Sequence, residues 1–188
     1  RQSFYQDHPW MLAFGEGLVG YKPPLSKREI TDIKERLDIK DDTIAVNILT
    51  PHNKWTTHST WSDNLVMLTL GRGGPVIWVS ETDANKLSIK DNDWIEVLND
   101  NGSTIARACV SQRIPEGAIF MYHNQGRTVN VPLSPTTGNR GGLHNSISRI
   151  CPKPTHMIGG YAQLSWGMNY YGTIGANRDE FVLLRRLD

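Results

Sequence analysis

The sequence predicts a mainly β fold, a β-barrel with short peripheral helices and long ordered loops. Three observations predict it. Short runs rich in Ile, Val, Thr, Trp or Tyr recur along the chain, and Gly, Asn, Asp or Pro residues bound them. Among these runs only one brief helix is inserted, so strands and helices do not alternate as they do around a parallel sheet. The length of 188 residues, with 17 Gly and 10 Pro, fits one domain with substantial loops.

The first 42 residues are predicted to form an N-terminal arm and an amphipathic surface helix, ahead of a barrel domain over 43–188. Phe4–Gly20 mixes aromatic residues with glycines, which indicates a short helix and a covering arm. From Ser26, apolar residues recur at positions 30, 33 and 37, and Glu29 follows the Ser cap by three residues. The pattern predicts a capped surface helix over Ser26–Leu37.

The barrel is predicted from β-like runs in order along the chain. Ser80 caps a brief helix over Glu81–Leu87, and Asn99–Gly102 forms a hairpin turn. Arg185 and Arg186 are expected to be solvated charges at the end of the last strand. The predicted strands are Thr43–Leu49, Leu65–Leu70, Pro75–Val79, Trp94–Leu98, Thr104–Val110, Ala118–Tyr122 and Glu180–Leu187.

The distribution of charge indicates an anionic ligand. The net charge of +1 excludes a general nucleic-acid or membrane-surface binder. No acid occurs between Glu116 and Asp179, although arginines and histidines are frequent there. The same interval contains the long loop Thr128–Gly160, and loops of such length are usually functional. No run approaches the roughly 18 apolar residues that span a bilayer, so no direct membrane span is expected.

The segment that follows the first predicted strand crowds donors, acceptors and aromatic faces together. It contains His52, Trp55, His58 and Ser59, and loops at strand ends often line ligand pockets. The alternative is a pair of surface histidines on a polar loop. The spacing of His52 and His58 argues against a zinc site, because it fits neither an i,i+4 helical pair nor the usual finger spacing.

Two glycine-rich segments bring backbone amides close to Arg72 and Arg140, as phosphate-binding loops do, although ordinary tight turns are the alternative. No nucleophile motif or zinc-protease motif occurs. These features favour a module that holds a ligand over an isolated hydrolase. Cys109 and Cys151 are expected to be buried thiols in a reducing compartment.

Seven ordered blocks are spread along nearly the whole chain: Leu49–Trp55, His58–Asn64, Arg72–Pro75, Asp91–Val97, Arg140–Ser146, Lys153–Tyr161 and Asn177–Val182. Together they resemble the carboxy-terminal domain of the respiratory nitrate reductase alpha subunits. A less specific set of residues is similar to the dinucleotide-binding domain of the wider molybdopterin oxidoreductase (DMSO reductase) superfamily, with Asn92 in the turn and Glu116 before Gly117 in place of the usual Gly. The start of the chain, at Arg1 without a signal pattern, also suggests a piece of a longer protein.

The resemblance implies a six-stranded double-psi β-barrel that holds part of a molybdenum cofactor, bis(molybdopterin guanine dinucleotide). It implies no catalytic residue and no metal ligand in this fragment, and it places a [4Fe-4S] cluster elsewhere in the parent subunit. One pterin would contact His52, Trp55, His58 and Ser59. The other pterin or its phosphates would contact His123, His144 and Asn145. The resemblance assigns Arg72, Arg140 and Arg178 to pyrophosphate, and Asn169 and Asn177 to ribose or guanine.

The resemblance also implies partners and a reaction. The expected partners are the remaining domains of the alpha subunit, an iron–sulfur beta subunit and a membrane haem subunit, with nitrate as the substrate. The full subunit would reduce nitrate to nitrite on the cytoplasmic side, associated with the membrane through its complex, and the isolated fragment would be inactive. The alternatives are a nitrite oxidoreductase alpha subunit, which runs the reverse reaction, and a free-standing module that binds the cofactor without catalysis.

Overall fold

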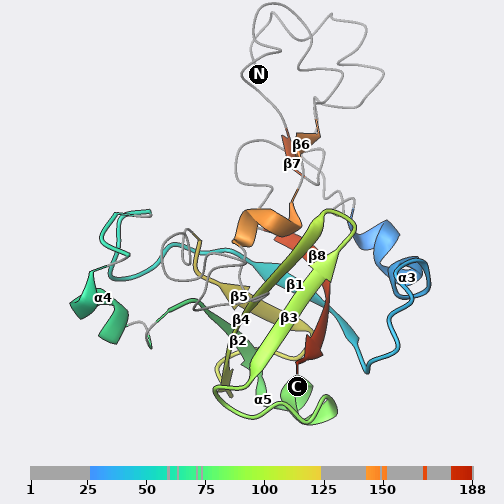
Figure 1. Cartoon of the computed structure of the whole chain (residues 1–188), viewed down its shortest axis with the longest axis horizontal. Coiled ribbons are helices and arrows are strands. Elements are labelled where there is room, and N and C mark those ends of the chain that lie inside the picture. The colour runs from blue at the N-terminus through green and yellow to red at the C-terminus, as the bar shows by residue number, and fades with distance from the viewer. Residues whose placement is uncertain are drawn as a thin grey trace, which may run out of the picture.

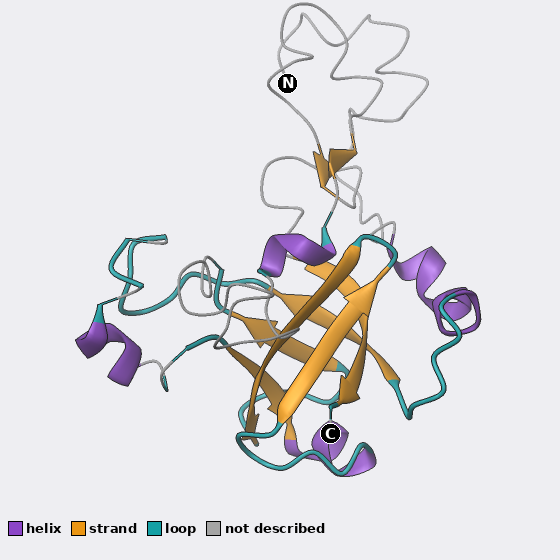
Figure 2. Cartoon of the chain, viewed as in Figure 1, coloured by secondary structure: helices purple, strands orange, loops and turns teal. Residues whose placement is uncertain are grey.

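Six strands form a closed barrel in the computed structural model, as Figure 1 and Figure 2 show. The predicted mainly β barrel is therefore confirmed. The structure describes residues 26–58, 60–62, 64–70, 72, 74–123, 143–148, 150–151, 167–168 and 179–187. The barrel strands are β1 (Ile44–Leu49), β2 (Val76–Ser80), β3 (Trp94–Asn99), β4 (Gly102–Ser111), β5 (Ala118–Met121) and β8 (Asp179–Arg186).

The strand order around the barrel is β1-β5-β2-β4-β3-β8. Two neighbouring pairs are parallel, β1 with β5 and β2 with β4, and the other four pairs are antiparallel. Parallel neighbours cannot be joined by a tight hairpin, so the chain must cross over between them. A closed six-stranded sheet with two such crossovers is the double-psi β-barrel that the family resemblance implied.

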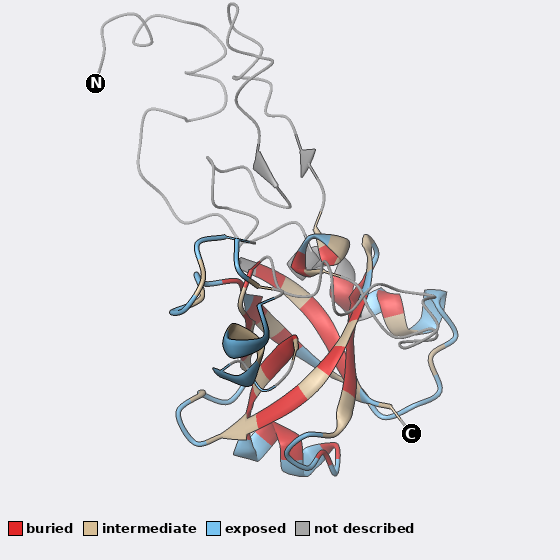
Figure 3. Ribbon diagram, turned by 60° about the vertical axis from the view of Figure 1, so that its left-hand side comes forward, coloured by how far each residue is buried: buried red, intermediate tan, exposed pale blue. Residues whose placement is uncertain are grey.

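The barrel interior is the main hydrophobic core. Along β1 the inward positions Val46 and Ile48 are buried, whereas Ala45 and Leu49 are exposed, which is the alternation of a strand with one face toward the core. Figure 3 shows mainly buried and half-buried residues along the other barrel strands. Closing the sheet also removes the free edges that an open sheet would present.

Helix α3 (Ser26–Arg36) lies on the outside of the barrel, and its prediction is confirmed to within one residue at its end. Its residues Ile30 and Ile33 form a second, smaller apolar cluster with Leu98 and Leu183 of β3 and β8. The cluster holds the helix against the barrel wall, at the right of Figure 1.

Leu65–Leu70 is the helix α4 rather than the predicted strand, so that prediction was wrong. Local hydrogen bonds decide the conformation. The Asn64 side-chain oxygen accepts a hydrogen bond from the Val66 N–H at 2.9 Å. The Asn64 backbone carbonyl accepts from the Leu68 N–H, also at 2.9 Å. The barrel is already closed by six other strands, so it offers no edge on which this apolar run could pair.

The remaining elements lie at the two ends of the barrel, which differ. At one end, β1 and β5 finish and β8 begins, and we call it the histidine end. It carries the β3–β4 hairpin turn and the 3₁₀ helix η1 (His144–Ile147). The opposite end, where β8 finishes and α5 (Glu81–Lys86) lies, is called the ion-paired end. Outside the barrel, β6 (Ile150–Cys151) pairs with β7 (Gly167–Met168).

Predicted turns and caps at these ends agree with the structure. Ser80 caps α5 by accepting a hydrogen bond from the Asp83 N–H at 3.0 Å. Asn92 has a φ of 72°, in the left-handed region that Asn tolerates. The long loop expected over Thr128–Gly160 lies largely outside the described residues. Cys109 is buried, as expected, and its burial raises the pKa of the thiol.

Arg185, near the end of β8, is ion-paired, contrary to the expectation of a solvated charge. It donates hydrogen bonds to Glu96 at 2.7 Å and to Asp41 at 2.5 Å, and its side chain is 24% exposed. Arg186 is exposed, as expected, and donates to the Ser88 carbonyl at 3.1 Å. The two acidic residues that meet Arg185 lie far away in sequence, one on the neighbouring strand β3 and one before β1, which the local pattern of charges did not indicate.

Candidate functional site

Two histidines meet because β1 and β5 are parallel neighbours. Their register pairs Asn47 with Ala118 and Leu49 with Phe120, so continuing both strands brings His52 beside His123. The backbone N–H of His123 donates to the Pro51 carbonyl at 3.1 Å. The centroids of the His52 and His123 imidazole rings lie 4.2 Å apart, with the rings edge to face. The barrel topology thus places side chains from two distant segments at one end of the molecule.

His58 reaches the same place through a tight turn. The Thr60 N–H donates to the Thr57 carbonyl at 3.0 Å, and His58 within this turn has a φ of 51°. The left-handed region is uncommon for a residue other than Gly, and such outliers are frequent at functional sites. The turn directs His58 so that its Nδ1 lies 3.2 Å from His123 Nε2.

The hydrogen bonds of His123 define which ring nitrogen carries a proton. Its Nδ1 lies 3.0 Å from the Pro51 carbonyl oxygen, which can only accept, so Nδ1 carries the proton. In the neutral ring, Nε2 therefore accepts the hydrogen bond that His58 Nδ1–H donates. Pro51 thus fixes the tautomer of His123 and directs the Nε2 lone pair toward the other imidazoles.

A fourth imidazole, that of His144, comes from η1. Its ring centroid lies 5.9 Å from that of His123, and the side chain is buried. The Ile147 carbonyl, at the end of η1, accepts from Asn99 Nδ2 at 2.7 Å and from Asn101 Nδ2 at 3.0 Å. These two amides of the β3–β4 hairpin hold η1, and His144 with it, at the histidine end.

The four imidazoles form one cluster with a closed and an open side. His123 and His144 are buried, whereas His52 and His58 are exposed. The structure thereby brings together two sets of residues that the family resemblance had assigned to two different pterins. Asn145 is exposed beside His144, and Trp55 is 47% exposed on the loop that follows β1, with Lys54 Nζ 4.5 Å from its ring centroid.

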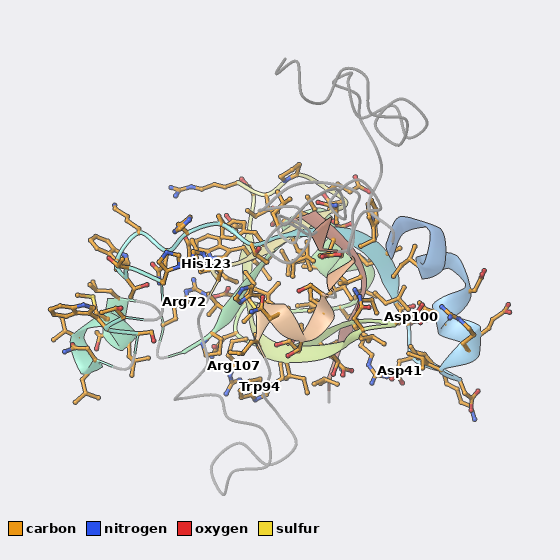
Figure 4. The ribbon with its side chains drawn as sticks, turned by 90° about the horizontal axis from the view of Figure 1, so that it is seen from above. Asp41, Arg72, Trp94, Asp100, Arg107 and His123 are labelled. Atoms are coloured by element: carbon orange, nitrogen blue, oxygen red, sulfur yellow. The ribbon has the colours of Figure 1, made fainter. Side chains whose placement is uncertain are left out.

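Arg72 has a partner that the sequence did not indicate. Its guanidinium donates to both carboxylate oxygens of Asp91, at 2.9 and 3.1 Å, and the hydrogen bond to Asp91 raises the pKa of Arg72. Both side chains are about half exposed, at 47% and 52%. In Figure 4, Arg72 and His123 lie on the α4 side of the barrel, opposite Asp41 and Asp100. Asp91 would therefore compete with a phosphate for the charge of Arg72.

One buried group near the cluster was missed by sequence reasoning. Thr50 directly follows β1, is 1% exposed, and its Oγ1 has no hydrogen-bond partner within the part of the chain that the structure describes. A buried hydroxyl without a partner is rare. Nothing in the local sequence indicated that this hydroxyl would be buried. Five predicted contacts, Ser59, Arg140, Asn169, Asn177 and Arg178, lie outside the described residues, and their roles stay predictions.

A closed barrel whose parallel strand ends carry clustered imidazoles defines a ligand-binding barrel domain. A family model described as "Molydopterin dinucleotide binding domain" matches residues 46–164. The chain belongs to this molybdopterin dinucleotide-binding family.

Individual relatives agree with the family. The chain is 60% identical over 187 residues to the respiratory nitrate reductase 2 alpha chain of Escherichia coli K12, covering 100% of this chain and 15% of that one. It is 54% identical over 187 residues to the nitrate reductase alpha chain of Bacillus subtilis, again covering 100% of this chain and 15% of that one. It is 33% identical to the perchlorate reductase subunit alpha of Dechloromonas aromatica, over 99% of this chain and 18% of that one. The chain therefore spans about 15% of the length of its first relatives.

A solved structure shares the fold. The acetylene hydratase of Pelobacter acetylenicus superposes with a TM-score of 0.57 at 16% identity, covering 95% of this chain and 22% of that one. At this identity the similarity concerns the fold alone.

The described residues fit the pterin part of such a cofactor. A pterin presents ring nitrogens, amino groups and a carbonyl, and imidazoles can donate to or accept from each of them. The cluster supplies such groups on its open side from His52 and His58, and the unpartnered Thr50 hydroxyl lies at the same strand end. The fit to the pyrophosphates rests on arginines, of which the described part of the chain contributes only Arg72 among those predicted.

Proposed function

We propose that this chain is the cofactor-binding domain of the catalytic subunit of a respiratory nitrate reductase. In this role it holds bis(molybdopterin guanine dinucleotide) at the histidine end of the barrel. The observation that carries the proposal is the convergence of His52, His58, His123 and His144 on the strand ends of a barrel from the molybdopterin dinucleotide-binding family.

The chain's own residues would bind and orient the cofactor. His123 is fixed by Pro51, and its Nε2 accepts from His58 Nδ1–H, so these hydrogen bonds set the tautomers of both neutral rings. A fixed pattern of this kind selects one orientation of a pterin ring and influences its protonation. When bound, the molybdenum cofactor supplies the two-electron redox chemistry. Predicted contacts outside the described residues would add the phosphate and guanine parts of the site.

The substrate and partners belong to the longer protein. Several bacterial nitrate reductase alpha chains are identical to this chain at 46–60% of positions, a perchlorate reductase subunit at 33%, and the respiratory nitrate reductase subunit alpha of Haloferax mediterranei at 28%. The highest of these identities belong to nitrate reductases, which supports nitrate, reduced to nitrite, as the reaction. We extend the proposal to an iron–sulfur beta subunit and a membrane haem subunit as partners, and to a cytoplasmic location at the membrane through that complex. No helix within the described ranges is long and apolar enough to cross a bilayer.

An apolar surface supports the view that other domains cover this one. Trp61, Leu65, Val66 and Leu70, on α4 and the turn before it, are 61%, 80%, 65% and 51% exposed. A surface cluster of large apolar side chains is typical of an interface. The first relatives are far longer than this chain, and we propose that the remaining domains of the same subunit pack on α4.

The proposal is tested by substituting two of the histidines in the longer protein. Losing one hydrogen bond of about 1.4 kcal/mol weakens binding roughly tenfold. We expect His52→Gln and His58→Gln each to lower the molybdenum content, measured by mass spectrometry, and the pterin content, measured by fluorescence after release. Lys40→Gln, an exposed substitution at the ion-paired end, serves as the control and should leave both unchanged. Unchanged molybdenum and pterin in both histidine variants would refute the assignment.

The separation between binding and catalysis has its own test. The 188-residue chain alone should not oxidise reduced viologen dye in the presence of nitrate, because the proposed site holds only one part of the cofactor. Nitrate-dependent oxidation by the chain alone would contradict the role given to it here.

A further inference from the structure

We propose that His52, His58 and His123 also bind a divalent transition-metal ion, with zinc as the ion that fits best, when the chain is free of its cofactor. The observation that carries this inference is that one ring nitrogen from each of the three imidazoles lies within 4.8 Å of the others. The inference does not depend on the proposed function, because it concerns only the geometry and chemistry of these three side chains.

The distance between two of the ligand atoms already suits a metal. On a tetrahedral zinc with Zn–N bonds of about 2.0–2.1 Å, two imidazole nitrogens lie roughly 3.3 Å apart. His58 Nδ1 and His123 Nε2 are 3.2 Å apart. An ion can therefore take the position between them with little movement of either ring. His52 is exposed, so its side chain can turn to supply the third nitrogen without disturbing the core.

His123 also has the outer hydrogen bond that metal-ligating histidines usually make. Its Nδ1–H donates to the Pro51 carbonyl at 3.0 Å, which leaves Nε2 as the lone pair turned toward the cluster. In the neutral cluster the His58 Nδ1–H donates to that lone pair. When an ion binds, it replaces this proton, and His58 carries its proton on Nε2 instead. The rearrangement is a tautomer change, so neutral imidazoles release no net proton.

The chemistry of the ligands selects the ion. Three imidazoles suit zinc, copper or nickel, whereas magnesium and calcium prefer oxygen ligands, and the group contains no carboxylate. Three protein ligands with an open side leave the fourth position to water, as in sites that keep an exchangeable ligand. The spacing of His52 and His58 alone argued against zinc, but the parallel β1–β5 pair adds a third ligand from 65 residues further along the chain.

Metal and cofactor would then compete for the same imidazoles. A zinc ion on His52, His58 and His123 occupies the ring nitrogens that the proposed function assigns to a pterin. The cofactor-free chain would be closed to the cofactor until a chelator or another ligand removed the ion. Free transition metal would in this way act as an inhibitor of cofactor insertion.

The test is a titration of the cofactor-free 188-residue chain with Zn²⁺ in competition with a chromophoric chelator. Co²⁺ serves as a spectroscopic probe, because four-coordinate Co²⁺ absorbs visible light much more strongly than six-coordinate Co²⁺. We expect one ion per chain and the four-coordinate spectrum. His58→Gln and His52→Gln should each weaken zinc binding by more than about 100-fold, since loss of an outer-shell partner alone costs 10–100-fold. Both residues are exposed, so these variants should keep the far-ultraviolet circular dichroism of the parent chain.

The matched control is Asp38→Asn, which removes an exposed carboxylate that does not belong to the group of three imidazoles. It should bind zinc like the parent chain. Zinc binding that is absent from the parent, unchanged in His58→Gln or lost in the control would overturn the inference. The outcome is independent of the proposed function: zinc binding that requires His58, together with an unchanged molybdenum content in the longer His58→Gln protein, would leave the metal site standing and refute only the pterin contact.

Discussion

The two ends of the barrel use polar side chains in different ways. At the ion-paired end, the buried Asp83 carboxylate accepts hydrogen bonds from the Gly117 N–H at 2.7 Å, from Ser80 Oγ at 2.8 Å and from Lys86 Nζ at 2.9 Å. At the histidine end, imidazoles face one another, and Thr50, which follows β1, has a buried hydroxyl for which the described residues provide no partner. The first arrangement satisfies its own groups and stabilises the fold. The second gathers groups that can each donate or accept a hydrogen bond.

The largest expected effect comes from breaking the ion-paired end at Asp83. Removing its carboxylate in Asp83→Ala leaves the Gly117 N–H, the Ser80 hydroxyl and the Lys86 ammonium without this acceptor, which should lower the free energy of unfolding by about 3 kcal/mol. Urea denaturation measures the change. Glu116→Ala is the control, because it removes only the exposed partner of Lys86 and should cost less than about 1 kcal/mol. Equal losses in the two variants would contradict the comparison.

The second-largest expected effect comes from substituting Gly102, which packs against η1 at the histidine end. This residue has a φ of 152°, and a Cβ added to it would collide with the Ser146 carbonyl oxygen of η1. We expect Gly102→Ala to cost about 2 kcal/mol and to displace η1 with His144, which nuclear magnetic resonance of the imidazole protons would detect.

Gly117→Ala is the matched control for the Gly102 substitution. Gly117 also has a positive φ, of 78°, but nothing lies within 4 Å of an added Cβ. Only backbone strain remains, so the expected cost is about 1 kcal/mol, with no change at the imidazoles. Shifted imidazole signals in Gly117→Ala would show that the two ends are not independent.

The pH dependence of the free energy of unfolding should test the role of Asp83 in the fold. Burial alone would raise its pKa, but hydrogen bonds from Gly117, Lys86 and Ser80 outweigh burial and hold the pKa below the ordinary value. A carboxyl with a lowered pKa in the folded state binds protons less readily there than in the unfolded chain. Its contribution to stability is therefore complete above the unfolded pKa of about 3.9 and is lost as the pH falls through the folded pKa.

Denaturation midpoints measured between neutral pH and acid should thus fall less steeply for Asp83→Asn than for the parent chain. The effect should be smaller than that of Asp83→Ala, since an amide still fills the site and accepts from the Gly117 N–H. Asp42→Asn, at an exposed position, serves as the control and should retain the slope of the parent. A parental slope in Asp83→Asn would show that other carboxyls dominate the acid response.

Local sequence signals predicted most of the fold. Alternating β-branched runs located all six barrel strands, and Ser80 with Asp83 located α5, because these signals depend on neighbours within a few residues. The strand prediction for Leu65–Leu70 failed because its apolar run resembles a buried strand, whereas the Asn64 hydrogen bonds start a helix turn. Periodicity alone does not distinguish the two in so short a run.

The candidate site was predicted in its members but not in its arrangement. Each histidine was found on its segment, yet the contact of His58 with His123 depends on the parallel pairing of β1 and β5, which joins residues about seventy positions apart in a way that no local pattern encodes. The same holds for the pairing of Arg72 with Asp91 and of Arg185 with Glu96. Long-range register decides which charges meet.

The smallest expected effect concerns Arg72. The comparison of the two ends does not decide whether this residue stabilises the fold or binds a ligand. Its ion pair with Asp91, made through Nη1 alone, is about half exposed, so Arg72→Gln should change the free energy of unfolding by only about 0.5 kcal/mol. If Arg72 serves pyrophosphate, Asp91→Asn should free its guanidinium and strengthen the binding of inorganic pyrophosphate to the chain, while Arg72→Gln should weaken it. The amide oxygen of Asn can still accept from the Val110 N–H, as Asp91 does now at 3.0 Å, so the turn is preserved. Isothermal titration with pyrophosphate separates the cases: opposite changes in the two variants assign Arg72 to the ligand, and no change in either assigns the bridge to the fold alone.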